Sequence, residues 1–140
     1  MTLTLIFTLD EEVYGLEVDA IQEIVEDPSL HFVPRAEGVL NGAINFHNQI
    51  LAEIDLPKLL GCLDEKRDHR RIVLTPAFNS LALTVGGIQR IVMLDLTMLQ
   101  PPPANAVDRA VRGVIDFEEF EVSLLDMDEI INKLENLYGG

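Results

Sequence analysis

Cysteine is almost absent from this chain of 140 residues, in which Cys62 is the only one. A single cysteine excludes an internal disulfide bond, so the simplest expectation is a reducing compartment. The first residues alternate threonine and leucine and carry neither the basic stretch nor the cleavage signal of a secreted protein. No apolar run reaches the roughly 18 residues that a membrane-spanning helix needs. The sequence therefore predicts a cytoplasmic protein without direct membrane insertion.

Basic residues are also scarce. Ten lysines and arginines stand against 24 aspartates and glutamates, which gives a formal net charge of −14 at pH 7. Such a surface repels phosphate backbones and anionic lipid head groups, so we expect no nucleic-acid partner and no membrane-surface partner. The acidity is either the ordinary charge of a soluble protein or a means of steering a basic partner. With 48% hydrophobic residues, the chain is long enough for one globular domain.

The residue patterns that mark catalytic, metal or cofactor sites are missing. His31, His47 and His69 lie on different predicted elements, each without a nearby histidine or cysteine. No glycine-rich loop ends in Lys and Ser or Thr, and Gly86-Gly87 precedes no capped helix. Acidic residues are so numerous that two carboxylates will meet by chance, which makes such a pair poor evidence for acid–base catalysis. We expect no enzyme, with no catalytic residues, no metal and no cofactor.

The most regular part of the chain is residues 33–61. It reads as an entry loop, a strand, a tight turn at His47 and Asn48, a second strand and a short helix. Asparagine tolerates positive φ better than most residues, which suits the turn. Asp55 is placed to cap the helix, and Gly61 to end it. This compact unit has little room for catalytic groups.

The rest of the chain predicts mostly hairpins. Apolar alternation predicts further strands at residues 2–9, 13–18, 72–74, 81–85, 88–94, 111–117 and 120–125. Several neighbouring strands are joined by short polar turns, and in total we expect about eight to ten strands with a few short helices. This pattern favours small antiparallel barrels over a parallel sheet.

Three further segments have distinct signatures. A helix is expected after Asp19, because Ile21, Ile24 and Val25 have helical spacing, and Pro28 limits it to about two turns. A final helix is expected behind an Asp126 cap. The mixed-charge stretch at residues 64–71 is expected to be a solvated loop, and the three prolines at 101–103 an extended spacer.

Five segments, in their order and spacing, resemble the CheW family of chemosensory coupling proteins over nearly the whole chain. Residues 7–16 resemble the family's opening hairpin, and residues 20–25 contain Ile-Gln-Glu-Ile where the family has V-Q-E-I. Residues 42–51, Gly-Ala-Ile-Asn-Phe-His-Asn-Gln-Ile-Leu, stand where the family has G-V-I-N-L-R-G-x-I-L. Residues 112–114 and 124–126 match the last hairpin and helix. Each match alone is weak, but together they are specific.

The resemblance implies a fold and a role. It implies a mainly β fold, with two side-by-side SH3-like five-stranded antiparallel barrels as subdomains of one CheW-like domain over residues 1–140. It also implies a non-catalytic adaptor that couples the cytoplasmic tip of chemoreceptors to the regulatory domain of a CheA-type histidine kinase. The partner-binding residues carried over from the family are Ile21, Glu23, Ile24, Gly42, Asn45 and His47. For both isoleucines the alternative is plain core packing, for Gly42 a backbone requirement, and for Asn45 a bond to neighbouring backbone.

The chain also departs from the family pattern. His47 stands where the family usually has arginine, and it lacks the fixed charge and the bidentate fork of that residue. Asn48 replaces a turn glycine, Ala52 a proline, and Gly86 a frequent aspartate. These changes predict a divergent member, and leave open whether it serves flagellar chemotaxis, surface motility or another chemosensory system. The alternative function is a double barrel that has lost coupling and binds a small ligand or another partner.

Overall fold

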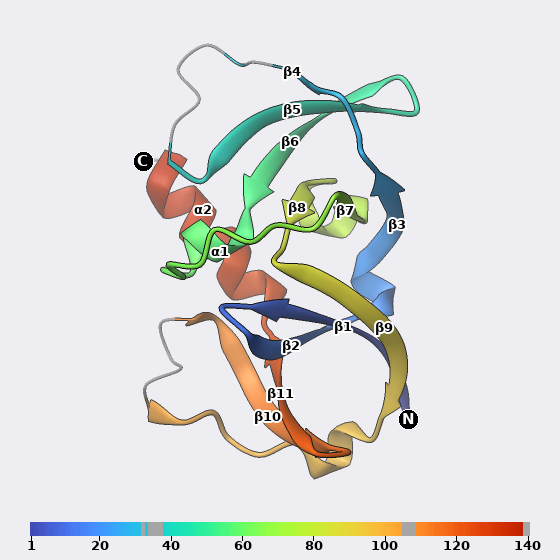
Figure 1. Ribbon diagram of the computed structural model, residues 1–140, viewed down its shortest axis with the longest axis vertical. Helices are drawn as coiled ribbons and strands as arrows, with labels where there is room; N and C mark the ends of the chain where they lie inside the picture. The colour runs from blue at the N-terminus through green and yellow to red at the C-terminus, as the bar shows by residue number, and fades with distance from the viewer. Residues whose placement is uncertain (32, 34–37, 105–108, 139–140) are drawn as a thin grey trace.

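The computed structural model describes residues 1–31, 33, 38–104 and 109–138, and eleven strands among them form two sheets (Figure 1). Sheet 1 contains, in spatial order, β10 (Val111–Phe117), β11 (Phe120–Leu125), β2 (Glu12–Glu17), β1 (Thr2–Leu9) and β9 (Gly87–Leu94). Sheet 2 contains β3 (Ile21–Glu26), β7 (Arg70–Leu74), β8 (Ala82–Thr84), β6 (Gln49–Asp55), β5 (Leu40–Phe46) and β4 (Leu30–His31). The predicted mainly β fold is confirmed.

The sheets differ in detail from the expected pair of five-stranded antiparallel units. Sheet 2 has a sixth strand, β4, of only two residues. Each sheet also contains one parallel pair, β11 with β2 and β6 with β8. These pairs join strands that are far apart in the sequence, and alternation within one strand carries no information about such a partner.

The helices are short and begin where the sequence predicts. Asp55 Oδ1 accepts a hydrogen bond of 3.2 Å from Lys58 N at the start of α1 (Leu56–Leu59). Asp126 Oδ1 does the same for Glu129 N at the start of α2 (Met127–Tyr138). The described residues also include three 3-10 turns: η1 (Val18–Ala20), η2 (Pro76–Phe78) and η3 (Leu96–Met98). Within the described ranges, no helix has the length and apolar character to cross a bilayer.

The helix expected after Asp19 is wrong. The chain there forms η1 and then β3, which pairs antiparallel with β7. The register shifts between Ile21 and Glu23, which marks a β-bulge with one extra residue. That residue puts Ile21 and Ile24 on the same face of the strand and so imitates the three-residue spacing of a helix. The β-branched side chains favour the strand.

The largest apolar cluster is shared by both sheets. It contains, all fully buried, Phe7 and Leu9 of β1, Leu56 of α1, Leu74 of β7 and Ile130 of α2. Smaller clusters occupy each sheet separately, Ile6, Val92, Leu94, Ile115 and Val122 in sheet 1, and Ile44, Phe46, Leu51, Val73 and Ala82 in sheet 2. Both faces of β1 are therefore buried at its centre, where the alternation had predicted one apolar face.

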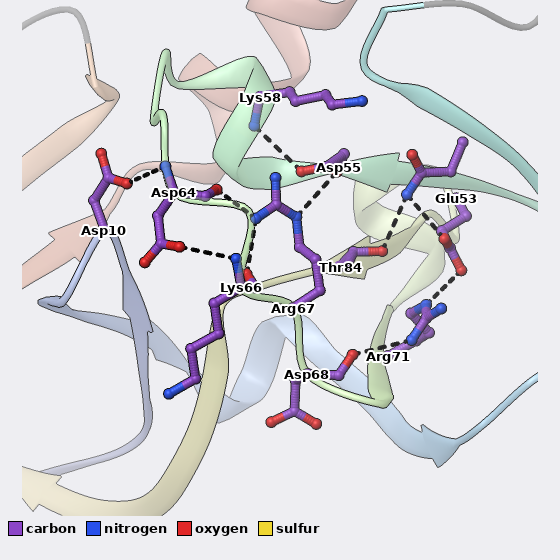
Figure 2. Close-up of polar contacts among 11 residues, drawn as sticks. Asp10, Glu53, Asp55, Lys58, Asp64, Lys66, Arg67, Asp68, Arg71 and Thr84 are labelled. Carbon is purple, nitrogen blue, oxygen red and sulfur yellow. Dashed lines mark hydrogen bonds and ion pairs between the residues drawn. The ribbon is translucent and has the colours of Figure 1, made fainter.

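The mixed-charge stretch is not simply solvated, and that prediction is wrong for its arginines. Arg67 Nε donates to Asp55 Oδ2 at 3.1 Å, and Arg71 Nε donates to Glu53 Oε1 at 2.6 Å (Figure 2). The side chains of both acids are almost fully buried, with 7% exposure for Asp55 and 1% for Glu53. The stretch from residue 63 to 71 is thus fastened to β6 of sheet 2 by charge-assisted hydrogen bonds.

The same stretch is also fastened to sheet 1. Asp10, in the turn between β1 and β2, accepts a hydrogen bond from Asp64 N at 2.7 Å (Figure 2). It also accepts one from Leu63 N at 3.2 Å. Asp68 accepts one of 2.6 Å from Ile88 N in β9. We call residues 63–71 with these partners the charged junction. It holds the two sheets to each other beside their shared core.

The ionisation of Asp68 makes this junction sensitive to acid. Burial by itself would raise the pKa of Asp68, but hydrogen bonds from the Arg70 side chain and from Ile88 N outweigh it and hold the pKa well below its ordinary value. A depressed pKa in the folded state adds stability above the unfolded pKa, and this stability is lost as the pH falls through the folded pKa.

We therefore expect Asp68→Asn to lower the free energy of unfolding at pH 7 and to flatten its decline below about pH 4. Urea unfolding followed by circular dichroism from pH 7 to acid would measure both effects. Glu65→Gln is the matched control, because Glu65 is an exposed carboxyl group in the same loop. If the two variants show the same pH profile as the parent chain, the Asp68 carboxylate does not contribute as described.

Candidate partner-binding surface

The structure brings two of the sequence-predicted contact residues together. Glu23 of β3 and His47 at the tip of the β5–β6 hairpin are 24 positions apart, yet His47 Nε2 lies 3.3 Å from Glu23 Oε1. Both side chains are well exposed, at 46% for Glu23 and 70% for His47. The imidazole and the carboxylate form an ion pair only when the histidine is protonated. This surface pair is available to a partner and contributes little to stability.

The hairpin tip has the predicted turn. His47 and Asn48 both have positive φ, of 48° and 66°, which is the backbone of a tight two-residue hairpin turn. Asn48 is tolerated in place of glycine because asparagine adopts this region more readily than other side chains. The His47 ring also lies edge-on against Phe46, with 4.3 Å between ring centroids. The buried Phe46 ring thus helps to hold the exposed imidazole toward β3.

Asn45 and Gly42 differ in what they offer to a partner. Asn45 is exposed and pairs across the hairpin with Ile50, whose side chain is 69% exposed. Gly42 is buried at a bulge in β5 with a φ of 151°, and a Cβ there would lie 2.5 Å from the carbonyl oxygen of His31. The geometry gives Gly42 a backbone role, since no side chain fits under β4. Ile50 is an exposed apolar neighbour of Asn45, and it is not among the contact residues carried over from the family resemblance.

Ile21 and Ile24 are half-buried and pack against the shared core. Their backbones pair with Leu74 and Ile72 of β7. These contacts support core packing as the role of both isoleucines, the alternative to partner binding. Any partner would touch only the outer part of these side chains. Glu23, Asn45, His47 and Ile50 are the exposed members of this region, which we call the hairpin surface.

A second candidate surface is a cleft of about 370 Å³ between strands of sheet 1, the turns η1 and η2, and the start of α2. Its apolar lining consists of Leu16, Ala20, Phe78, Leu125 and Met127, and its polar lining of Glu17, Asp19, Arg112, Asp126 and Asp128. Arg112 Nη1 donates to Glu17 Oε1 at 2.7 Å across one wall. The sequence did not indicate this cleft, because six elements, β2, η1, η2, β10, β11 and the start of α2, each supply only one to three of its residues.

Three polar groups of the described interior, on Cys62, Tyr14 and Arg109, lie close together. Burial raises the pKa of the Cys62 thiol against the opposing charge of Arg109, so the thiol stays protonated at neutral pH. Arg109 Nη1 lies 3.4 Å from Cys62 Sγ and donates to Tyr14 Oη at 3.3 Å. Burial likewise raises the pKa of Tyr14. Among the residues described, no group of three His, Cys, Asp or Glu side chains is arranged to hold a metal ion.

Comparison with known proteins places these surfaces in context. The family model described as a CheW-like domain matches residues 3–135. The chain is 25% identical to the chemotaxis protein CheW of Thermotoga maritima, covering 91% of this chain and 86% of that one. It is 26% identical to the chemotaxis protein CheV3 of Helicobacter pylori over 89% of this chain but only 43% of that longer protein. The crystal structure of the scaffolding protein TtCheW from Thermoanaerobacter tengcongensis superposes with a TM-score of 0.78 at 25% identity, over 89% of this chain and 88% of that one.

Proposed function

Because this chain belongs to the CheW-like family, we propose that it is a non-catalytic scaffold of bacterial chemosensory signalling, which couples chemoreceptors to a CheA-type histidine kinase. The observation that carries the proposal is the family match over residues 3–135, together with the superposition on a scaffolding protein. The partners proposed are the cytoplasmic tip of a chemoreceptor and the regulatory domain of the kinase. We also propose a cytoplasmic location, because the receptor tip and the kinase regulatory domain both lie in the cytoplasm.

The cleft beside the start of α2 suits the helical tip of a receptor. An amphipathic helix binds by placing its apolar stripe in an apolar groove, and the cleft has an apolar floor built from β2 and β11 of sheet 1, the turns η1 and η2, and α2. The acidic side chains of Asp19, Asp126 and Asp128 line the same cleft, which favours basic residues beside that stripe.

The hairpin surface suits a folded partner. It is the end of a β-hairpin, with the apolar Ile50 beside the polar Asn45 and the Glu23–His47 pair. A small apolar centre with a polar rim is the usual anatomy of a protein–protein contact. The kinase regulatory domain is itself CheW-like by the family resemblance, so a barrel end would meet another barrel. The replacement of arginine by His47 weakens the fixed charge at this contact.

We expect Glu23→Lys to weaken binding of the kinase regulatory domain by about tenfold, because it reverses the charge beside His47 at an exposed position. His47→Arg should strengthen the same contact, since arginine is charged at every physiological pH. Isothermal titration calorimetry with the regulatory domain and with a receptor-tip fragment from the same genome would measure both effects. Glu65→Lys, in an exposed part of the loop, is the matched control with the same charge change.

The expected pattern is specific. Thermal stability should stay nearly the same in both hairpin-surface variants, because the pair is exposed. Receptor-tip binding should respond less than kinase binding to Glu23→Lys. If neither fragment binds the parent chain at high micromolar concentration, the scaffold proposal is rejected. If Glu65→Lys weakens kinase binding as much as Glu23→Lys does, the effect comes from net charge alone. The hairpin surface is then not the kinase contact.

A further inference from the structure

Three of the four methionines of the chain are exposed in one region of sheet 1. The exposed fractions are 77% for Met1, 45% for Met93 and 61% for Met98. They line a hollow of about 490 Å³ between the end of β9, η3 and the strand β10, which also contributes Phe117. In Figure 1, η3 lies at the end of sheet 1 farthest from sheet 2. The hollow is thus remote from the β5–β6 hairpin tip.

The floor of this hollow is chemically unusual for a free surface. Methionine is flexible and polarisable, so it adapts to apolar side chains of different shapes and is overused at surfaces that bind peptides. The exposed methionines here are not covered by other described parts of the chain. A few large apolar side chains from a partner would fit among the methionines.

The rim of the hollow is acidic. Asp95, Asp116 and Glu121 line it, and none of its described lining residues is a lysine or an arginine. Hydrogen bonds from the Thr97 hydroxyl and backbone lower the pKa of Asp95, which keeps this carboxylate charged. The three carboxylates outnumber the one N-terminal amine of Met1, which lies close enough to Asp95 to help lower its pKa. The nearby Arg90 is already engaged, because its Nη2 donates to Glu118 Oε2 at 2.6 Å and its guanidinium lies over the Phe117 ring. The rim therefore attracts a cationic partner.

Two observations restrict the form of that partner. Gln100 and Val114 exchange two backbone hydrogen bonds, of 2.8 and 2.9 Å, so the outer edge of β10 is already occupied at its centre. An added strand cannot pair along this edge without displacing that bridge. The net charge of −14 also disfavours a second copy of this chain, which would bring the same acidic rim, as well as an anionic membrane. An α-helix needs no backbone partner and remains compatible with the hollow.

We propose that the methionine-lined hollow binds a basic amphipathic helical segment of a partner protein. Its apolar side chains, spaced by three or four residues, insert among Met93, Met98 and Phe117. Its lysines or arginines meet the rim carboxylates of Asp95, Asp116 and Glu121. This contact is separate from the two surfaces assigned to the receptor and the kinase, and it does not depend on the scaffold proposal.

The test uses the full chain and a fluorescently labelled synthetic helix of leucine and lysine with apolar residues on one face. Two peptides serve as comparisons, a scrambled isomer of the same composition and an analogue with glutamate in place of lysine. Fluorescence anisotropy at physiological salt is expected to show binding of the amphipathic peptide at least about tenfold tighter than the scrambled one. The glutamate analogue is expected not to bind.

Two substitutions locate the site. Met98→Glu should weaken binding of the amphipathic peptide by about tenfold or more, whereas Leu63→Glu, at a residue that is 92% exposed in the charged junction, should leave it unchanged. Glu121→Lys should weaken it as well, with Glu65→Lys as the control for net charge. Each of these side chains is exposed, so every variant is expected to keep the melting temperature of the parent chain.

Four outcomes would overturn the inference. Equal binding of the scrambled peptide would reduce the interaction to attraction by net charge. Unchanged binding by Met98→Glu would place the peptide elsewhere. Loss of kinase-domain binding in Met98→Glu would assign the hollow to the kinase contact instead of a separate partner. Failure of the peptide to bind while both signalling fragments do bind rejects only this inference and leaves the scaffold proposal intact.

Discussion

Arg71→Ala is expected to lower the free energy of unfolding by about 3–5 kcal/mol, because it leaves the Glu53 carboxylate buried without its cation. Glu53 is 1% exposed, and its remaining side-chain partner is the amide of Asn41, at 3.0 Å (Figure 2). Small domains are stable by only about 5–15 kcal/mol in total, so this one substitution removes a large share. Urea unfolding followed by circular dichroism would measure the loss.

A second pair supplies the matched control. Arg90 pairs with Glu118 at the same distance of 2.6 Å, but the two side chains are 48% and 52% exposed. Arg90→Ala should therefore cost no more than about 1 kcal/mol. The double variant Glu53→Leu with Arg71→Met, which removes both charges, should recover much of the stability lost in Arg71→Ala. If Arg71→Ala lowers the free energy of unfolding no more than Arg90→Ala does, burial of the Glu53–Arg71 pair has no energetic consequence. The charged junction then does not stabilise the fold as described.

Phe7→Ala is expected to destabilise the whole molecule by about 3–5 kcal/mol, since it opens a cavity in the core that both sheets share. Phe7 is fully buried on the face of β1 that meets sheet 2. We propose that the chain is one domain with two subdomains, and this core is what would couple them. Unfolding should then remain a single transition, with coincident midpoints for probes in sheet 1 and sheet 2.

Ile6→Ala tests the coupling from the opposite face of the same strand. Ile6 is also fully buried, but it belongs to the cluster inside sheet 1. In a coupled domain, Ile6→Ala lowers amide-exchange protection in β6 and β7 of sheet 2 as well as in sheet 1. If sheet 2 keeps its protection while sheet 1 opens, the two sheets fold independently and the single-domain proposal is wrong.

Local features of this fold were predictable from the sequence because local rules produce them. The turn at His47 and Asn48, the caps at Asp55 and Asp126, and the hairpin of β10 and β11 each depend on residues within a few positions of one another. Gly86 is a further case. Its N–H donates to Thr8 O, and a Cβ there would lie 2.5 Å from that oxygen, which is the close backbone approach that paired glycines indicate.

What the sequence did not reveal depends on distant partners. The β-bulge in β3 reproduces helical spacing, so periodicity alone could not separate the two structures. The ion pairs of Glu53 and Asp55 were not predicted, because their cations Arg71 and Arg67 lie 18 and 12 positions away in the sequence. The Glu23–His47 contact joins two residues that the resemblance had named separately. The cleft is formed by six elements, and no single one of them indicates it in the sequence.

The route of the chain through the two sheets has a consequence for biosynthesis. β1 and β2 are made first, but their neighbours β9, β10 and β11 are made only after all of sheet 2. The strands of sheet 2 are thus consecutive along the chain, and sheet 2 can form on the ribosome before β9 and β11, the partners of β1 and β2, have been synthesised. A nascent chain that stops before residue 111 would leave β2 without β11 and the shared core without α2. Folding of sheet 1 is therefore one of the last events of synthesis.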